Sequence, residues 1–227
     1  MNSMSQHFEA AVEAIPRTLL DRSGKAFYSG RNAFSSGSPL YILGANPGGT
    51  PESHVEETVR SHTQWVSAIA PKDWSAYRDE SWKGKRPGHH GMQPRILHAL
   101  SVLGLDPGSV PASNVVFVRS QRESSLDGDF ESLAIQCWPL HEHVIRVVRP
   151  KVVLCLGITA GNFVRERLGA FSKTASFIEH NARRWQSHSY TGVGAAIVVV
   201  ATHPSIADWR APATDPTGLM VRAIYGS

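Results

Sequence analysis

The chain has 227 residues, of which 41% are apolar and 19% charged, a globular composition that excludes a collagen-like or disordered chain. Its length fits one domain with a sizeable core. The net charge of +4 is mildly basic, which permits nucleic-acid binding without demonstrating it.

Hydrophobic periodicity predicts strands that alternate with helices along the chain. The predicted elements, in chain order, are a helix at 5–20, a strand at 40–45, a helix at 92–103, a strand at 114–120, a helix at 133–148, a strand at 151–157, a helix from 159, a strand at 195–202 and a helix at 215–225. A long polar stretch occupies 49–90, and 172–194 is predicted to form a loop or a hairpin.

The four predicted strands are almost continuously apolar, which is typical of strands buried on both faces of a parallel sheet. We therefore expect an α/β fold: a three-layer α/β/α sandwich around a central, mostly parallel four-stranded sheet. Ligands of such sheets collect at the carboxyl ends of the strands. Here those ends carry the sequences GANPGG, RSQR, GITAG and THPSIADW.

Targeting and membrane signals are missing from the sequence. The first thirty residues hold no apolar run of the about 7–15 residues that a signal peptide needs. The longest apolar stretch, 195–201, is far below the about 20 residues of a membrane helix. Only two cysteines, Cys137 and Cys155, fit a reducing compartment and exclude a cysteine-only metal cage. We expect a cytoplasmic protein with no membrane association.

Two strand ends carry candidate chemistry. Asn46 offers amide donors and an acceptor behind the first strand, among glycines that permit close backbone approach, so it can position a water or a base edge. The alternative is an asparagine that caps the turn before Pro47. At the last strand end, Pro204 stiffens the backbone between His203 and Ser205. A lone histidine is usually structural, but polar strand ends in one sheet converge on one crevice.

Other motifs are rejected. GVGAAI at 192–197 precedes a strand and lacks the third glycine of a dinucleotide fingerprint. His141 and His143 lie two apart on a helix and do not face each other, so they do not form a metal site. Neither a G-x-S-x-G elbow nor a G-x-x-x-x-G-K-[ST] phosphate loop occurs in the sequence. We expect no metal and no cofactor.

The chain resembles the uracil-DNA glycosylase superfamily. The family's G-x-x-P-G motif matches Gly44-Ala45-Asn46-Pro47-Gly48, and its H-P-S motif matches His203-Pro204-Ser205. The elements between the motifs follow the family's order. The resemblance covers about 40–48 and 86–225, which makes 1–227 a single uracil-DNA glycosylase-like domain with an insertion at about 49–85. Only Cys137 resembles a cluster ligand of the iron–sulfur classes, so no cluster can form.

The resemblance implies a DNA glycosylase that hydrolyses the N-glycosidic bond of uracil or a related damaged or mismatched base. It implies that Asn46 orients the attacking water and that His203 stabilises the negative charge on the departing base. Because an amide is a poor general base, the rate should depend on positioning and electrostatics. The substrate-binding residues implied around Asn46 are Gly44, Ala45, Pro47 and Gly48.

Reaching the base requires its extrusion from the duplex. The resemblance implies that the loop holding Pro204 enters the minor groove, with Ser205 near a phosphate and Ile206 or Trp209 as an apolar wedge. Arg183 and Arg184 are candidates for phosphate contacts, or else form a solvated surface pair. We expect a monomer whose partner is DNA, single- or double-stranded.

Many family members carry an asparagine at the end of the second strand to bind the amide edge of uracil, whereas 114–120 ends on Ser120. One hydroxyl can donate or accept, so we expect weak discrimination between uracil and cytosine. Asn46, Ser120 and His203 should line one pocket. Part of 49–90 should fold over it, with Trp65 stacking on the base. The alternative is that tryptophans such as Trp65 anchor the loop.

A second hypothesis, from a different functional class, stays open at this point. It is a catalytically silent superfamily member that binds a nucleobase, a nucleotide or a nucleic-acid end in the same crevice.

Overall fold

The computed structural model describes residues 3–35, 37–121, 130–192 and 196–226. The α-helices in these ranges are α1 Ser3–Glu13, α2 Val59–Ala68, α3 Ala76–Asp79, α4 Gln93–Val102, α5 Phe130–Val148, α6 Ile158–Arg167 and α7 Thr217–Tyr225. The strands are β1 Leu40–Gly44, β2 Ala112–Asn114, β3 Val152–Leu156, β4 Ser172–Ile178, β5 Gln186–Thr191 and β6 Ile197–Ala201. Within the described ranges, none of the helices has the length and apolar character needed to cross a membrane.

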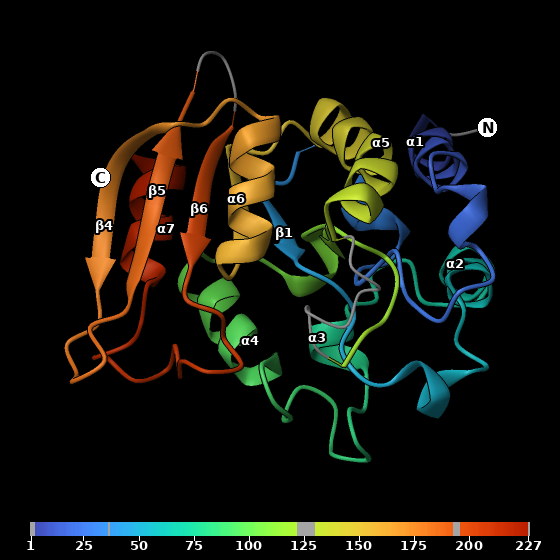
Figure 1. Cartoon of the computed structure of the whole chain (residues 1–227), viewed down its shortest axis with the longest axis horizontal. Coiled ribbons are helices and arrows are strands. Elements are labelled where there is room, and N and C mark those ends of the chain that lie inside the picture. Colours follow the sequence, from blue (N-terminus) through green and yellow to red (C-terminus); the bar gives the residue numbers. More distant parts are fainter. Residues whose placement is uncertain (1–2, 36, 122–129, 193–195, 227) are drawn as a thin grey trace.

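The strands form one six-stranded sheet in the order β2-β1-β3-β6-β5-β4 (Figure 1). The first four in this order are parallel, and β5 and β4 are antiparallel to their neighbours. The α/β class is confirmed, but the prediction of a four-stranded sheet is wrong. The polar region 172–194 contains a hairpin that adds two strands, and β4 is largely exposed at the edge, so it lacks the apolar run that marks a buried strand.

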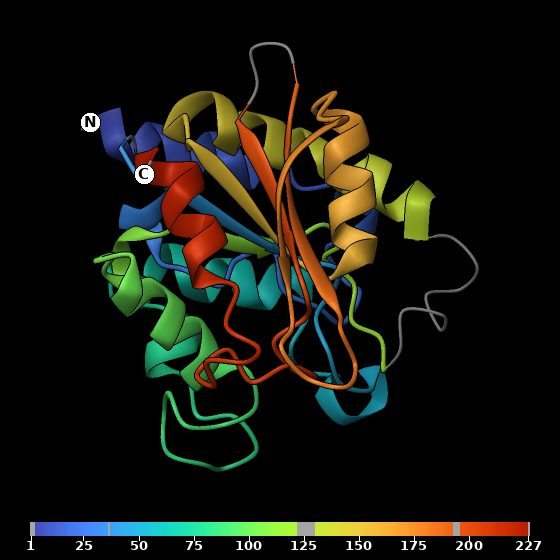
Figure 2. The ribbon, with the colours of Figure 1, turned by 90° about the vertical axis from the view of Figure 1, so that its left-hand side faces the viewer.

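Both faces of the parallel strands are covered because their apolar side chains alternate in direction. In β1, Tyr41 and Leu43 belong to the hydrophobic cluster that includes residues of α1, α5 and α6. Leu40 and Ile42 belong to the second cluster, with residues of α4 and α7. Figure 2 shows the sheet between α7 and α4 on one side and α6 on the other. This is the three-layer arrangement expected from the sequence.

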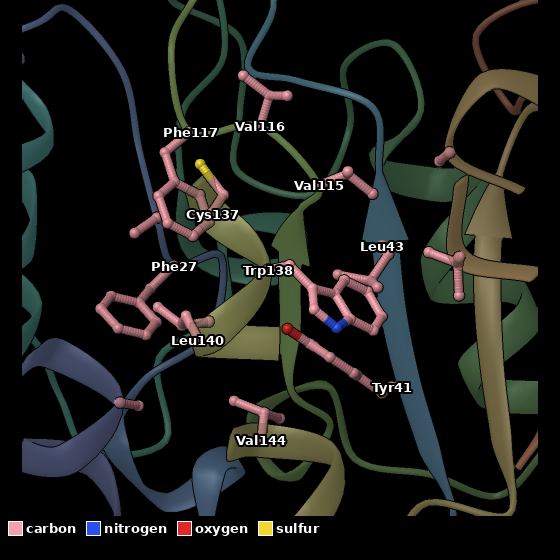
Figure 3. Close-up of a cluster of buried hydrophobic side chains, with 14 of the residues drawn as sticks. Phe27, Tyr41, Leu43, Val115, Val116, Phe117, Cys137, Trp138, Leu140 and Val144 are labelled. Carbon is pink, nitrogen blue, oxygen red and sulfur yellow. The ribbon is translucent and has the colours of Figure 1, made fainter. Parts of the chain in front are cut away.

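The cluster around Tyr41 also contains a buried histidine. Figure 3 shows Tyr41 and Leu43 beside Trp138 of α5. The Tyr41 hydroxyl lies 2.8 Å from Nδ1 of His141, which is fully buried. Burial lowers the pKa of His141 to about 4. His141 therefore belongs to the core.

The predicted bounds of the second strand are wrong. The strand ends at Asn114, which is paired with Gly44 of β1. Beyond it the backbone leaves the regular ladder: the Val116 N–H donates to the Ala45 carbonyl at 2.9 Å, and the Lys25 N–H donates to the Phe117 carbonyl at 2.9 Å. The apolar run that follows Asn114 is buried between two irregular segments. It therefore has the composition of a strand but does not pair with neighbouring strands in a regular ladder.

Candidate functional site

A cavity of about 780 Å³ opens at the carboxyl ends of the parallel strands. Asn46, Ser120 and His203 all line it, as the positions of the predicted strand ends implied. Gly44, Ala45 and Gly48 line it as well, and Pro47 is the member of the first motif that does not. The two motifs, more than 150 residues apart in sequence, therefore meet at one site.

The amide of Asn46 is held in one orientation. Its Nδ2 donates to the Pro47 carbonyl at 3.0 Å and to Oγ of Ser120 at 2.9 Å. A carbonyl oxygen can only accept, so the nitrogen must face Pro47 and the amide cannot be flipped without losing that bond. Among the described residues, no hydrogen bond involves Oδ1 of Asn46. The arrangement leaves an acceptor for a water or another donor.

Asn114 is a cavity residue that sequence reasoning missed. It ends β2, lines the cavity and is 7% exposed. A Cβ on Gly44 would lie 2.2 Å from Oδ1 of Asn114, so the glycine makes room for this amide. Asn114 is the first residue of NVVFVRS, and the apolar run behind it predicts a strand that continues to Ser120, so composition alone does not mark Asn114 as a strand end. The cavity therefore has an amide side chain at Asn114, six residues before Ser120 in the sequence.

His203 is held by its neighbour in the H-P-S motif. The backbone N–H of Ser205 donates to Nδ1 of His203 at 3.1 Å, and the Ser205 hydroxyl lies 2.7 Å from the same atom. A backbone N–H can only donate, so Nδ1 accepts and the proton of the neutral ring is on Nε2. His203 can therefore act as a donor towards a ligand. Arg95 of α4 donates a hydrogen bond to the Pro204 carbonyl and so holds the loop that carries the H-P-S motif.

The stretch at 49–90 closes part of the cavity, as expected, but with different residues. Trp82, Lys83 and His90 line the cavity. Trp65 does not: it lies on α2 and packs edge-on against Trp74, with ring centroids 5.0 Å apart. The choice of Trp65 as the stacking residue is wrong, because its side chain anchors α2 to the core.

One wall of the cavity carries paired charges. Lys25 is 6% exposed, and its Nζ lies 2.5 Å from Glu80 and 3.1 Å from Glu57. Arg119 pairs with the other oxygen of Glu57. Burial lowers the pKa of Lys25, but its neighbours Tyr28, Glu80 and Glu57 outweigh that effect, so its pKa lies above the ordinary value. This wall is polar and nearly neutral overall.

The residues assigned to DNA contact separate into two groups. Ser205 and Ile206 are exposed, and Ile206 is 55% exposed. Pro204 is buried, and Trp209 is fully buried, with its indole N–H donating to the Thr202 carbonyl at 3.0 Å. Trp209 as a wedge is therefore wrong, because the side chain is part of the core and cannot enter a groove.

The two arginines of the predicted pair also differ. Arg183 pairs with Glu179 at 3.1 Å and donates to the Ile206 carbonyl at 2.8 Å. Arg184 is exposed and has no ion pair among the described residues.

Comparison of the chain with family models and with curated proteins gives no match. Its function is therefore inferred from the geometry of this site.

Proposed function

We propose that this protein is a DNA glycosylase-like hydrolase that cleaves the N-glycosidic bond of uracil or a related damaged or mismatched base. The observation that carries the proposal is one cavity lined by the oriented amide of Asn46, the amide of Asn114 and the imidazole of His203. Base excision needs one group that binds the edge of the base, one that orients the attacking water and one that stabilises the departing anion, and the cavity has a group for each. The cavity volume of about 780 Å³ is ample for an extruded nucleoside.

The proposed reaction assigns one task to each group. The water donates to Oδ1 of Asn46, which directs the water oxygen at C1′ of the sugar. The C1′–N bond breaks, its electron pair leaves with the base, and the water oxygen forms the new bond to C1′. The water's surplus proton passes to solvent. Nε2–H of His203 donates to the base as its negative charge develops.

We assign recognition of the base to Asn114, which supplies the amide that Ser120 lacks. A carboxamide presents one acceptor and two donors, which matches the N–H and C=O of uracil's imide edge. The Ser120 hydroxyl instead accepts a hydrogen bond from Asn46. With Asn114 in this position, we propose that the cavity favours uracil over cytosine, whose edge presents an amino donor where uracil presents a carbonyl.

Cations at the cavity rim support a polyanionic ligand. Lys83 lines the cavity, and Lys85 and Arg86 follow it on an exposed loop. None of the three makes an ion pair with a described residue. Uncompensated cations beside a binding site attract phosphates and make binding dependent on salt concentration. DNA is therefore the partner that we propose.

The test is release of free base from single-stranded and duplex oligonucleotides that contain uracil. Asn46→Ala should lower the single-turnover rate by about 10²-fold while DNA affinity changes only a few-fold, because the water-directing amide acts on the transition state. His203→Ala should have a comparable effect, since a donor to developing charge typically contributes about 3–4 kcal/mol.

The alternative from the other functional class has a distinct outcome. If wild type releases no base from any oligonucleotide tested, and Asn46→Ala weakens nucleotide binding, then Asn46 is a ligand contact and the protein is a silent binder.

Ser120→Asn, which adds a second amide near Asn46, should not raise uracil selectivity, because we assign base recognition to Asn114.

A further inference from the structure

The turn between β4 and β5, residues 179–185, is docked on the loop that follows β6. The His180 N–H donates to the Ala213 carbonyl at 2.8 Å, and Arg183 donates to the Ile206 carbonyl at 2.8 Å. Figure 1 shows the hairpin turn and this loop at the same end of the sheet. The added hairpin thus brings a segment of its own to the carboxyl edge, where the cavity opens.

Arg183 makes three contacts where the turn at 179–185 meets the loop that follows β6. Its guanidinium pairs at 3.1 Å with Glu179, which is 1% exposed, and lies 4.1 Å from the ring centroid of Trp185. With the bond to the Ile206 carbonyl, the guanidinium joins a buried carboxylate, an aromatic ring and the loop. Arg183 is therefore a positioning residue, and its side chain is engaged within the protein.

The exposed side chains on this joint surface are of two kinds. Trp185 is 38% exposed, and its ring lies against the Arg183 guanidinium. Ile206 is 55% exposed, and its backbone carbonyl accepts a hydrogen bond from the same guanidinium. Arg184 adds an exposed cation, in a left-handed conformation with φ of 54°. Its backbone N–H donates to Oδ1 of Asn181 at 3.3 Å, so the turn has a defined shape.

We propose that Trp185, Arg184 and Ile206 form one nucleic-acid contact surface beside the cavity. Trp185 stacks on a base whose neighbour has been extruded from the strand, and Arg184 contacts a phosphate. Nucleic acid is favoured because this surface is continuous with the site: the Ile206 N–H donates to the carbonyl of His203, a cavity residue. Extruding one base exposes the faces of the adjacent bases, which aromatic and apolar side chains cover. The inference rests on the proposed function only in that the ligand is a nucleic acid.

The test measures binding by fluorescence anisotropy with labelled oligonucleotides, one single-stranded and one duplex with an abasic site. Trp185→Ala should weaken binding to both by about tenfold or more, as expected for loss of one stacked base. Trp185→Phe keeps an aromatic ring and should stay within about threefold of wild type. Phe171→Ala is the matched control, because Phe171 is 66% exposed at the opposite end of the hairpin and should have no effect.

Arg184→Gln provides a second variant that leaves Trp185 and its packing unchanged. It should lower the slope of log affinity against log salt concentration by about one phosphate contact. Unchanged affinity in Trp185→Ala, or equal losses in Trp185→Ala and Phe171→Ala, would overturn the proposal, as would an unchanged salt slope in Arg184→Gln. Base release is measured separately: a wild type that binds DNA in this way without releasing base refutes the proposed function alone.

Discussion

Asn46 uses both of its amide hydrogens within the protein. One goes to the Pro47 carbonyl and one to the Ser120 hydroxyl, so the side chain is oriented before any ligand arrives. Preorganisation of this kind matters most for a residue that cannot take up a proton, because geometry is all that an amide contributes to the attack of water. Ser120 therefore acts through Asn46 and is a positioning residue.

Ser120→Ala tests this role. Removing the hydroxyl leaves the Asn46 amide with one anchor, and we expect kcat for base release to fall by about 3- to 10-fold with KM nearly unchanged, which is the range of one hydrogen bond. Ser120→Thr keeps the hydroxyl and should restore most of the rate. A rise in KM with constant kcat would instead make Ser120 a direct contact of the base.

Among the elements, the pairing of β1 with β2 places Asn114. Gly44 and Asn114 are partners in the parallel ladder, and the missing side chain of Gly44 provides the space that the Asn114 amide occupies. A Cβ on Gly48, in the same motif, would have no described residue's atom within 4 Å beyond its chain neighbours. The two glycines of the G-x-x-P-G motif therefore serve different purposes.

Gly44→Ala should displace the Asn114 amide, because the added Cβ would lie 2.2 Å from Oδ1. We expect a lower melting temperature and a loss of discrimination between uracil and cytosine in base release. Gly48→Ala, whose methyl group enters open space, should melt within a degree or two of wild type, on the order expected for a small surface change. Equal melting temperatures and equal uracil discrimination for wild type and Gly44→Ala would contradict this role of Gly44.

The segment between β1 and α4 brings an aromatic ring to the cavity through Trp82. Its ring is half-buried and packs edge-on against Tyr77, with centroids 6.1 Å apart. Trp82→Ala should weaken oligonucleotide binding by about 1–3 kcal/mol if the base stacks on this ring. Trp65→Ala is the matched control from the same segment: it should lower stability through the lost contact with Trp74 while leaving affinity at low temperature unchanged. Larger losses of affinity in Trp65→Ala than in Trp82→Ala would reverse this assignment.

Across the whole molecule, two buried histidines link folding to pH. Burial, together with the cations Lys25 and Arg119, lowers the pKa of His62 to about 3, and burial lowers that of His141 to about 4. In the unfolded chain the pKa of each is ordinary, at about 6.5. Between these values only the unfolded chain binds the protons, so the free energy of unfolding is fully retained above about pH 6.5 and falls as the pH drops towards 4.

Each histidine should contribute a slope of about 1 kcal/mol per pH unit over that range, measured by urea denaturation at a series of pH values. His62→Phe should remove about half of the slope that the two histidines produce. It should cost little at neutral pH, because it also removes Nδ1, a buried atom without a hydrogen-bond partner among the described residues. His89→Gln, at an exposed position, is the control. Identical slopes in wild type and His62→Phe would contradict the assignment.

The class of the fold and the place of the site could be predicted without coordinates. Continuous apolar runs predicted three of the four parallel strands, β1, β3 and β6, because a strand buried on both faces usually consists of apolar residues. The remaining parallel strand, β2, has the sequence Ala-Ser-Asn and has no such run. Asn46 and His203 followed from their places after such runs, since parallel strands end at one edge. These inferences depend on local composition and on a rule of topology, so they required no knowledge of contacts.

Only the tertiary structure shows which side chains reach the cavity. Trp65 and Trp82 lie in the same polar stretch, and their different surroundings arise from long-range packing that periodicity does not record. Trp209 follows a polar motif yet is buried, and Asn114 begins an apolar run yet ends a strand. In each case the outcome depends on residues far apart in sequence, because burial and hydrogen-bond pairing are properties of the folded neighbourhood and not of the local segment.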